Sequence, residues 1–410
     1  MTGPRVVVTG VGPVTPIGTG RHDFWQAQLK GVSGIRTITR FDATGLPVRI
    51  AGEVDLPPGL APGRREELAT DRSTHLALAA TRLALDDAGL DLGALDRDRV
   101  GVVIGTGAGG ASSWERNARL LQTDGPRRIG ARSVVMSMAN APSANVAIAH
   151  GITGPSTSVV TACASGAEAL ITASQMIVSG EADVVLAGGA EAPVTALIVA
   201  GFARAGALSL RNAEPERAAR PFGADRDGFV LSEGAAVLVL ESEEHARGRG
   251  AEVLAALEGY GRTSDAHHVA GPHPEGAGAA RAIRRALRSA GWAPSDVSYV
   301  NAHGTGTRYN DDAEAKALRA VLGGAAAHVP VSATKSMTGH ALGAAGAVEA
   351  VASVLALRHG IVPPTLNLDS PDPAIGLDVV GAEPRPAELR AVLSDSFAFG
   401  GHNVVLAFGS

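Results

Sequence analysis

The chain has 410 residues, of which 45% are apolar and 19% charged, and its formal net charge is −5. This length is sufficient for two core-forming units or one large fused domain, and the composition is typical of a soluble globular protein. There is no basic tract, and aromatic residues make up only 3% of the chain, which argues against nucleic-acid binding. A single cysteine excludes a disulfide framework and favours a reducing compartment.

The sequence indicates neither a leader segment nor a membrane anchor. A buried strand is predicted from residue 5, so no signal peptide is expected before it. No run of about 18 apolar residues lacks polar breaks, so no membrane span is expected. We therefore expect a cytoplasmic protein.

Strand and helix patterns alternate along the N-terminal half. Strands are predicted at residues 5–12, 96–105, 158–161, 182–189 and 235–241, and helices at residues 21–29, 73–88, 130–151 and 164–179. Residues 51–69 and 201–234 are predicted to be irregular. The glycine turn after the first strand resembles part of a dinucleotide-binding fingerprint. Pro13 and Pro16 interrupt the required helix start and the third glycine is missing, so we expect no nucleotide site there.

The second half of the chain repeats the first. Residues 82–105 and 284–306 both read as a helix, a turn containing Ala-Gly, a strand and a Gly-Thr-Gly loop. Two tandem copies of one β/α unit predict pseudo-twofold symmetry, with largely parallel sheets covered by helices. We place the two halves at residues 1–250 and 251–410. Glycine loops at strand ends can meet near the pseudo-axis, which is the natural place for a site.

The only cysteine, Cys163, lies between a predicted strand and a predicted helix, in Thr-Ala-Cys-Ala-Ser-Gly. Free backbone N–H groups and the positive end of the helix dipole converge there. We expect this setting to lower the thiol pKa and to favour the thiolate that attacks acyl groups. A lone cysteine among apolar residues is more often part of the core, so the catalytic interpretation depends on the other motifs.

Two histidines lie in loops that match the cysteine loop. His303 is part of Asn-Ala-His-Gly-Thr-Gly-Thr, and His340 is part of Lys-Ser-Met-Thr-Gly-His. A cysteine and two histidines in matching strand-end loops indicate a nucleophilic site. No metal is expected, because Cys163 has no partner cysteine and the loose histidine cluster lacks metal-ligand spacing. That cluster comprises His267, His268 and His273.

These motifs, together with Ser-Phe-Ala-Phe-Gly-Gly-His-Asn near the end of the chain, occur in order and at specific separations. With them the chain resembles the β-ketoacyl-[acyl-carrier-protein] synthases of the elongating type, over essentially its whole length. It is similar to synthase II and to the ketosynthase-α subunits of type II polyketide systems. The resemblance implies an α/β thiolase-like fold with five layers, α-β-α-β-α, and two pseudo-symmetric halves.

The resemblance also implies roles for the site residues. Cys163 accepts the acyl chain as a thioester, and its backbone N–H forms an oxyanion hole with that of Phe399. His303 and His340 hold the malonyl thioester carbonyl and stabilise the enolate left when CO₂ departs. The carbanion then attacks the acyl thioester and gives the β-ketoacyl product. No metal or organic cofactor is implied beyond the phosphopantetheine of the acyl carrier protein.

Further residues are assigned supporting roles by the same resemblance. Lys335 and Glu349 are expected to form a charged pair that holds the His340 loop. The expected substrate contacts are Thr305, Thr307, Ala108, Phe397 and Gly400. Because carrier proteins are acidic, we expect a basic rim at the tunnel mouth, although each candidate could equally be a solvated surface charge. The candidates are Arg64, Arg65, Arg127, Arg128 and Arg204.

Two positions depart from the family pattern. Ala398 lies between the two phenylalanines, where the family usually has glycine, and its restricted backbone predicts a stiffer gate at Phe399. Ala108 stands where relatives often carry a bulkier apolar residue, which predicts a longer acyl tunnel or one completed by a partner subunit. Both departures favour a specialised, polyketide-like system.

Four related classes fit the residues less well. A degradative thiolase needs a second catalytic cysteine, a chain-length factor lacks the cysteine, and a loading decarboxylase has glutamine in its place. Initiating synthases use Cys-His-Asn, whereas the second basic position here is His340. An elongating condensing enzyme remains, in fatty acid or polyketide synthesis, as a homodimer or as a heterodimer with a chain-length-factor-like homologue.

Overall fold

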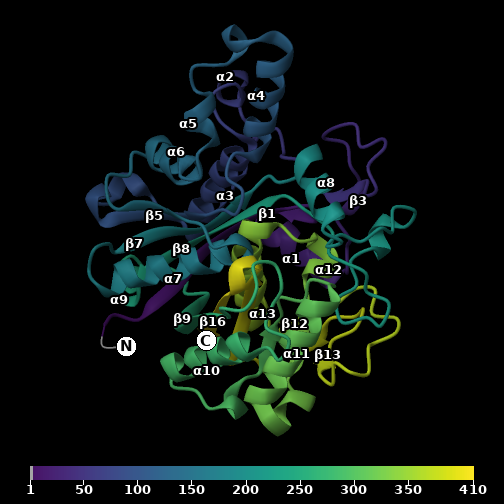
Figure 1. Cartoon of the computed structure of the whole chain (residues 1–410). Coiled ribbons are helices and arrows are strands. Elements are labelled where there is room, and N and C mark those ends of the chain that lie inside the picture. The colour runs from purple at the N-terminus through teal and green to yellow at the C-terminus, as the bar shows by residue number, and fades with distance from the viewer. Residues whose placement is uncertain (1–2) are drawn as a thin grey trace.

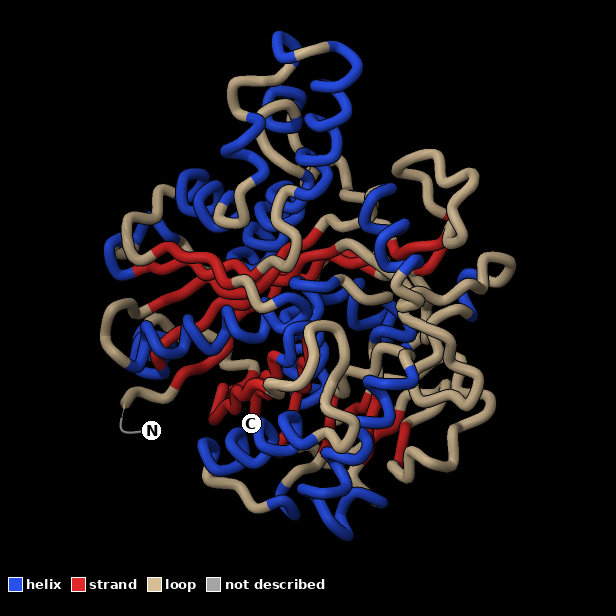
Figure 2. The backbone as a smooth tube through the Cα atoms, in the orientation of Figure 1, coloured by secondary structure: helices blue, strands red, loops and turns tan. Residues whose placement is uncertain are grey.

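Five layers of helices and strands are stacked in the computed structural model, which describes residues 3–410 (Figure 1). Helices form an outer, a middle and a second outer layer, in the pairs α3 (Arg72–Ala88) and α6 (Ala141–His150), α7 (Ser165–Val178) and α13 (Ala345–His359), and α10 (Ala277–Ala290) and α11 (Arg308–Leu322). Figure 2 shows the strands in red between these layers of blue helices. The predicted α-β-α-β-α arrangement is confirmed.

The two halves contain sheets with the same strand order. The first sheet runs β1 (Val6–Thr15), β8 (Gly234–Ser242), β7 (Val184–Glu191), β5 (Val100–Gly105) and β6 (Ser156–Val159). The second runs β9 (Ala255–Ser264), β16 (His402–Gly409), β15 (Ala391–Ala398), β10 (Tyr299–Asn301), β11 (Pro330–Ser332) and β13 (Asp378–Val379). In each sheet the first two strands are antiparallel to their neighbours, and the next three are parallel to one another.

The predicted pseudo-symmetry is therefore present in the strand order and directions. The sheets are joined through β1 and β9, where Val7 pairs with Ala256 and Val8 with Ala255. The predicted boundary at residue 250 falls in the connection between α9 (Glu243–Gly248) and β9. That boundary stays a prediction.

Glycines in the first strand of each half let an outer helix lie directly on the sheet. In β1, a Cβ on Gly12 would lie 2.0 Å from the carbonyl oxygen of Ala80 in α3. In β9, a Cβ on Gly261 would lie 1.9 Å from the carbonyl oxygen of Ala282 in α10. The glycine pattern of the first strand thus serves helix packing, and its counterpart in β9 is a further mark of the repeat.

Most elements predicted for the N-terminal half occur within a few residues of the predicted bounds, and α1 (Arg21–Leu29) coincides with them. Residues 130–151 form two helices, α5 (Ser133–Ser137) and α6, rather than one. Two helices were not predicted, α4 (Ala111–Asp124) and α8 (Ala196–Arg204). Each has a single buried residue, Ser113 in α4 and Val199 in α8, and leaves large apolar side chains exposed, such as Trp114 and Leu197.

Short elements complete the described structure. They are α2 (Arg64–Glu67), α12 (Lys335–Thr338), β2 (Gly18–Thr19), β3 (Ile35–Thr37), β4 (Ile50–Gly52), β12 (Ile361–Val362) and β14 (Arg385–Pro386). In Figure 1, α2 and α4 lie together on a projection at the top of the molecule, at a distance from the second sheet.

One helical stretch, Leu342–His359, is long and apolar enough to cross a membrane by length and composition. The sequence analysis did not single it out. In the structure 89% of this stretch is buried, because α13 lies in the middle layer and packs against both sheets. A helix surrounded by protein has no polar face, which explains its composition.

Candidate active site

Cys163 lies in the 3-10 turn Ala162–Ala164, between β6 and α7, and is buried. Ala162 directly before it has a φ of 50°, a conformation that residues with a side chain rarely adopt. The backbone N–H groups of Phe399 and of Cys163 itself lie close to the sulfur and favour its charged form. These are the two N–H groups that the family resemblance assigns to an oxyanion hole.

Burial raises the pKa of the Cys163 thiol to about 11. The charge of Lys335 and the two N–H groups lower it, but by less than burial raises it. The expectation of a lowered thiol pKa is therefore wrong. It took account of the helix N-terminus and not of the removal of the thiol from water.

His303 follows β10 and His340 follows α12, and their rings lie close together. The ring centroids are 5.3 Å apart and the planes are nearly perpendicular, at 85°. Burial lowers the pKa of both rings well below 6.5, and the nearby charge of Lys335 lowers it further. Both imidazoles are therefore neutral at physiological pH.

Lys335 connects this pair of histidines to a buried carboxylate. Its Nζ forms an ion pair with Glu349 of α13 and donates to His303, at 3.1 Å from Nδ1 and 2.7 Å from the carbonyl oxygen. An ammonium group can only donate, so Nδ1 accepts and the ring proton of His303 is on Nε2. Burial raises the pKa of Glu349 to about 7, while Lys335 lowers it.

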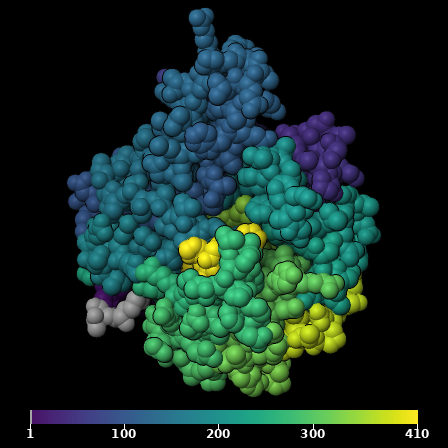
Figure 3. Space-filling model, viewed as in Figure 1, coloured from purple at the N-terminus to yellow at the C-terminus, as the bar shows by residue number. Residues whose placement is uncertain are grey.

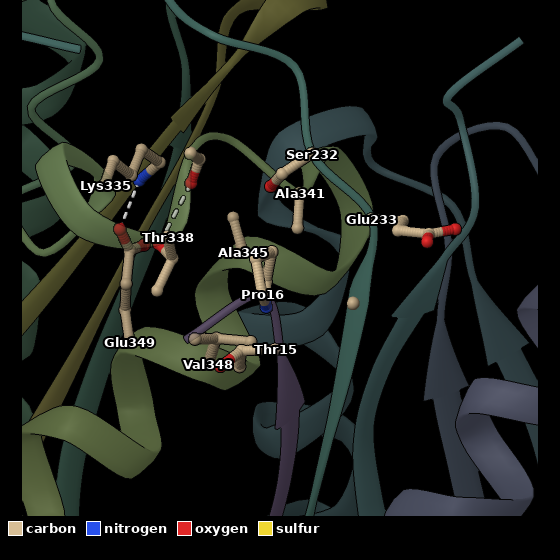
Figure 4. Close-up of a pocket in the computed structure, with 12 residues that line it drawn as sticks. Thr15, Pro16, Ser232, Glu233, Lys335, Thr338, Ala341, Ala345, Val348 and Glu349 are labelled. Carbon is tan, nitrogen blue, oxygen red and sulfur yellow. Dashed lines mark hydrogen bonds and ion pairs between the residues drawn. The ribbon is translucent and has the colours of Figure 1, made fainter. Parts of the chain in front are cut away.

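Lys335 and Glu349 thus form the predicted charged pair, but the histidine that this pair supports is not the predicted one. Lys335 binds His303, whereas the sequence analysis expected the pair to hold the His340 loop. Lys335 belongs to α12, which precedes His340, and its side chain extends across to the other histidine. Figure 4 shows Lys335 and Glu349 directed toward each other on one side of a small cavity, with Ser232 and Ala341 on the other side.

Two further buried carboxylates hold the loops of the site, and the sequence analysis missed both. Glu314 of α11 accepts from the backbone N–H groups of His303 (2.7 Å) and Gly304 (2.8 Å). Glu191, the last residue of β7, accepts four hydrogen bonds from other loops. Burial raises the pKa of each to about 7. An acidic residue at the end of an apolar strand is the signal that could have revealed Glu191.

A row of aromatic rings leads from the gate to the histidines. Phe399 lies 6.1 Å from Phe202, Phe202 lies 5.4 Å from Phe229, and Phe229 lies 5.2 Å from His340, all between ring centroids. Phe397 lies on the other side, 6.2 Å from His303. Phe202 and Phe229 were not predicted, because each lies far along the chain from the four motifs and reaches the site only through folding.

The other predicted contacts surround this centre. The hydroxyls of Thr305 and Thr307 are 2.9 Å apart, and Thr307 caps α11 by accepting from the N–H of Asn310. Ala108 is half-buried in the loop after β5, and Gly400 is exposed with a φ of 83°. The roles predicted for these residues stay predictions.

The five predicted arginines lie apart from the centre, on exposed surface. Arg64 and Arg65 belong to α2, Arg127 and Arg128 to the 3-10 turn Pro126–Arg128, and Arg204 ends α8. None of them forms an ion pair with another part of residues 3–410. Within the same residues no group of three or more His, Cys, Asp or Glu side chains is arranged to hold a metal ion.

Comparison with known proteins agrees with this geometry. Residues 4–246 match the family model "Beta-ketoacyl synthase, N-terminal domain", and residues 254–369 match "Beta-ketoacyl synthase, C-terminal domain". The 3-oxoacyl-[acyl-carrier-protein] synthase 2 of Synechocystis is 46% identical over 405 residues, which are 98% of this chain and 97% of that protein.

Solved structures are similar over the full length. The ishigamide ketosynthase/chain length factor has a TM-score of 0.94 at 38% identity, with all of both chains covered. A type II PKS acyl-carrier protein in complex with its ketosynthase bound to the hexaketide has a TM-score of 0.92 at 35% identity, with the same coverage. These matches, together with the Cys-His-His centre, show that the chain belongs to the β-ketoacyl synthase family of acyltransferases.

Proposed function

We propose that this enzyme extends an acyl chain held on Cys163 by condensing it with malonyl-carrier protein, releasing CO₂ and β-ketoacyl-carrier protein. The observation that carries the proposal is a buried thiol beside two backbone N–H groups, next to two neutral imidazoles that Lys335 and Glu349 support. Relatives named 3-oxoacyl-[acyl-carrier-protein] synthase 2 support the same reaction.

The first step is acyl transfer. The sulfur of Cys163 attacks the thioester carbonyl of the acyl-carrier protein, and the carbonyl oxygen takes up the negative charge. The N–H groups of Cys163 and Phe399 lie where they stabilise that oxyanion. The pantetheine thiolate leaves and receives the proton that Cys163 loses, so charge and protons balance. Because the thiol is mainly protonated, loss of its proton accompanies its attack on the thioester.

The second step is decarboxylation and carbon–carbon bond formation. His303 donates from Nε2, and His340 donates from its ring, to the malonyl thioester carbonyl. The bond to the carboxylate breaks, CO₂ departs, and its electron pair forms an enolate that the two donors stabilise. The enolate carbon attacks the acyl-Cys163 carbonyl, the Cys163 thiolate leaves, and it takes one proton from solvent. The steps require no cofactor beyond the phosphopantetheine of the carrier protein.

We propose that the exposed arginines receive the carrier protein. Arg64, Arg65, Arg127, Arg128 and Arg204 are exposed and form no ion pair within residues 3–410, so their charges are free to meet an acidic surface. The similar structure that contains an acyl-carrier protein bound to its ketosynthase supports this kind of partner. In Figure 3, yellow C-terminal atoms reach the surface where the teal and green parts of the chain meet.

We further propose that the enzyme works as a dimer through β6. This strand ends the first sheet with an unpaired edge among residues 3–410. Large apolar side chains are exposed on the neighbouring α4, α5 and α6 and directly after β6, namely Trp114, Val134, Val135, Met138, Ile148 and Val160. An exposed strand edge beside an apolar patch is a typical interaction surface. A second copy of the chain covers this surface by pairing its own β6 with this β6 about a twofold axis. A chain-length-factor-like homologue is the alternative partner, as in similar structures.

The proposed cellular setting follows from the substrates. Carrier-protein thioesters and a single unpaired thiol suit the cytoplasm, and the proposed reaction involves neither nucleic acid nor a membrane.

Mass spectrometry of the intact protein tests the reaction. The chain is incubated with acyl-carrier protein and then with malonyl-carrier protein, alone and with a co-encoded homologue that lacks the cysteine. We expect the mass of one acyl group on Cys163, followed by β-ketoacyl-carrier protein. Cys163→Ala is the control and should show neither.

The three results have different meanings. Product from the single chain supports a self-sufficient homodimer of the fatty acid type. Product only with the homologue supports the catalytic half of a polyketide heterodimer. No acylation of Cys163 under either condition overturns the proposed mechanism.

A further inference from the structure

The pseudo-symmetry gives the nucleophile a counterpart in the second half. The 3-10 turn Leu342–Ala344 precedes α13 as the turn Ala162–Ala164 precedes α7, so Gly343 corresponds to Cys163. Each of these two residues directly follows a non-glycine residue with a positive φ, which is 43° at Leu342 and 50° at Ala162. Such conformations persist only where the surrounding structure holds them.

A buried carboxylate occupies the counterpart position. Glu191 is fully buried, and its Oε2 accepts from the N–H groups of Gly343 (2.9 Å) and Gly107 (2.5 Å). Its Oε1 accepts from the N–H of Ala108 (3.0 Å) and the hydroxyl of Thr106 (2.9 Å). All four groups donate, so above its pKa of about 7 Glu191 satisfies them as an ionised carboxylate without a proton of its own.

The two glycines are required by this close approach. A Cβ on Gly343 would lie 2.6 Å from Oε2 of Glu191, and a Cβ on Gly107 would lie 2.9 Å from it. No side chain fits at either position while the carboxylate is there. The reaction steps proposed above do not use Glu191, so its four hydrogen bonds need another explanation.

The carboxylate links the two loops that flank the nucleophile. A Cβ on Gly107 would lie 3.5 Å from the carbonyl oxygen of Ala162, so the loop after β5 runs beside the Cys163 turn. Leu342 packs in the same apolar cluster as Cys163. Glu191 therefore fixes Ala108 from one half and Leu342 from the other half around the sulfur.

We propose that Glu191 is a positioning residue that shapes the acyl-binding wall beside Cys163. This inference rests on the proposed function. Glu191 controls acyl transfer to Cys163 and the choice of acyl chain, and it does not act on malonyl decarboxylation, which depends on His303 and His340. Glu314 of α11 holds the backbone of His303 and Gly304 in a similar manner, by accepting from their N–H groups.

The test measures the two half-reactions separately in the full-length enzyme. Acylation of Cys163 is followed with short- and long-chain acyl-carrier proteins, and decarboxylation is followed with malonyl-carrier protein alone. Glu191→Gln replaces one carboxylate oxygen by an amide NH₂ group, which cannot accept hydrogen bonds from the backbone N–H groups around it. We therefore expect roughly tenfold slower acylation with altered chain-length preference. Decarboxylation should stay within about twofold of the wild type. Glu191→Asp, which keeps the carboxylate, should recover part of the acylation rate.

Two further variants complete the design. Glu314→Gln should show the reverse pattern, with slower decarboxylation and a smaller effect on acylation. Thr106→Val removes one donor to Glu191 and keeps the carboxylate, so it should slow acylation in the same direction even if Glu191→Gln does not fold. Equal losses in both half-reactions, or an unchanged acylation rate, overturn the inference. A wild-type enzyme that does not acylate Cys163 overturns the proposed function instead.

Discussion

Replacing Lys335 by methionine leaves Glu349 buried without its partner, at a site where both side chains are at most 3% exposed. Removing one member of a buried ion pair costs about 3–5 kcal/mol of the free energy of unfolding. Part of this cost depends on pH, because the unpaired carboxyl can take up a proton. In the wild type the pKa of Glu349 is about 7, and losing Lys335 raises it further. The penalty of Lys335→Met should therefore shrink by about 1 kcal/mol between about pH 8 and pH 6.

Urea unfolding of the wild type, Lys335→Met, Glu349→Gln and the double variant at the two pH values measures these differences. The double variant should lose less than the sum of the single variants, since the second substitution removes the unpaired charge. Decarboxylation by Lys335→Met should fall roughly 10- to 100-fold, because Nδ1 of His303 loses its donor and the proton is no longer confined to Nε2. A penalty that is independent of pH, together with additive losses in the double variant, would refute this account.

Three further predictions follow from other parts of the structure. Ala398 has an extended backbone (φ −116°, ψ 157°), so Ala398→Gly loosens the gate and should speed acyl transfer about two- to fivefold in rapid-mixing assays; unchanged kinetics would contradict the stiff gate. Gly12→Ala places a Cβ 2.0 Å from a carbonyl oxygen of α3 and should lower the free energy of unfolding by about 1–3 kcal/mol, whereas Gly59→Ala, in open space, should not. Burial raises the pKa of Glu191 from 4.5 to about 7. Between these two pH values the folded protein keeps the carboxyl proton of Glu191, whereas the unfolded chain has lost it. The wild type should therefore lose roughly 2–3 kcal/mol of stability relative to Glu191→Gln as the pH rises from about 5 to about 8, and a flat difference would argue against a buried carboxylate that titrates there.

The sequence was sufficient for the parts of the protein that depend on local patterns. Periodicity located most strands and helices of the first half, and the repeat predicted the pseudo-symmetric layers. The loop motifs around Cys163, His303 and His340 identified the centre, because small residues at strand ends mark positions where backbones come close to a substrate.

Properties that depend on distant parts of the chain could not be predicted in this way. The thiol pKa was predicted in the wrong direction because it depends on burial by several elements, which the residues near Cys163 do not show. The partner of Lys335 and the roles of Glu191 and Glu314 depend on contacts between segments that are up to 152 residues apart. α4 was not predicted, and its one buried residue is Ser113, so burial in the core does not explain where this helix forms.

The position of the last strand has a consequence for how the protein reaches this fold. β16 lies between β15 and β9, so the second sheet cannot close until residues 402–409 have left the ribosome. Until then the part of α7 that packs on β16 has no cover in the nascent chain. Such non-local pairing makes folding slow and exposes aggregation-prone surface. We therefore expect folding of this protein during synthesis to depend on chaperones far more than its well-packed native state suggests.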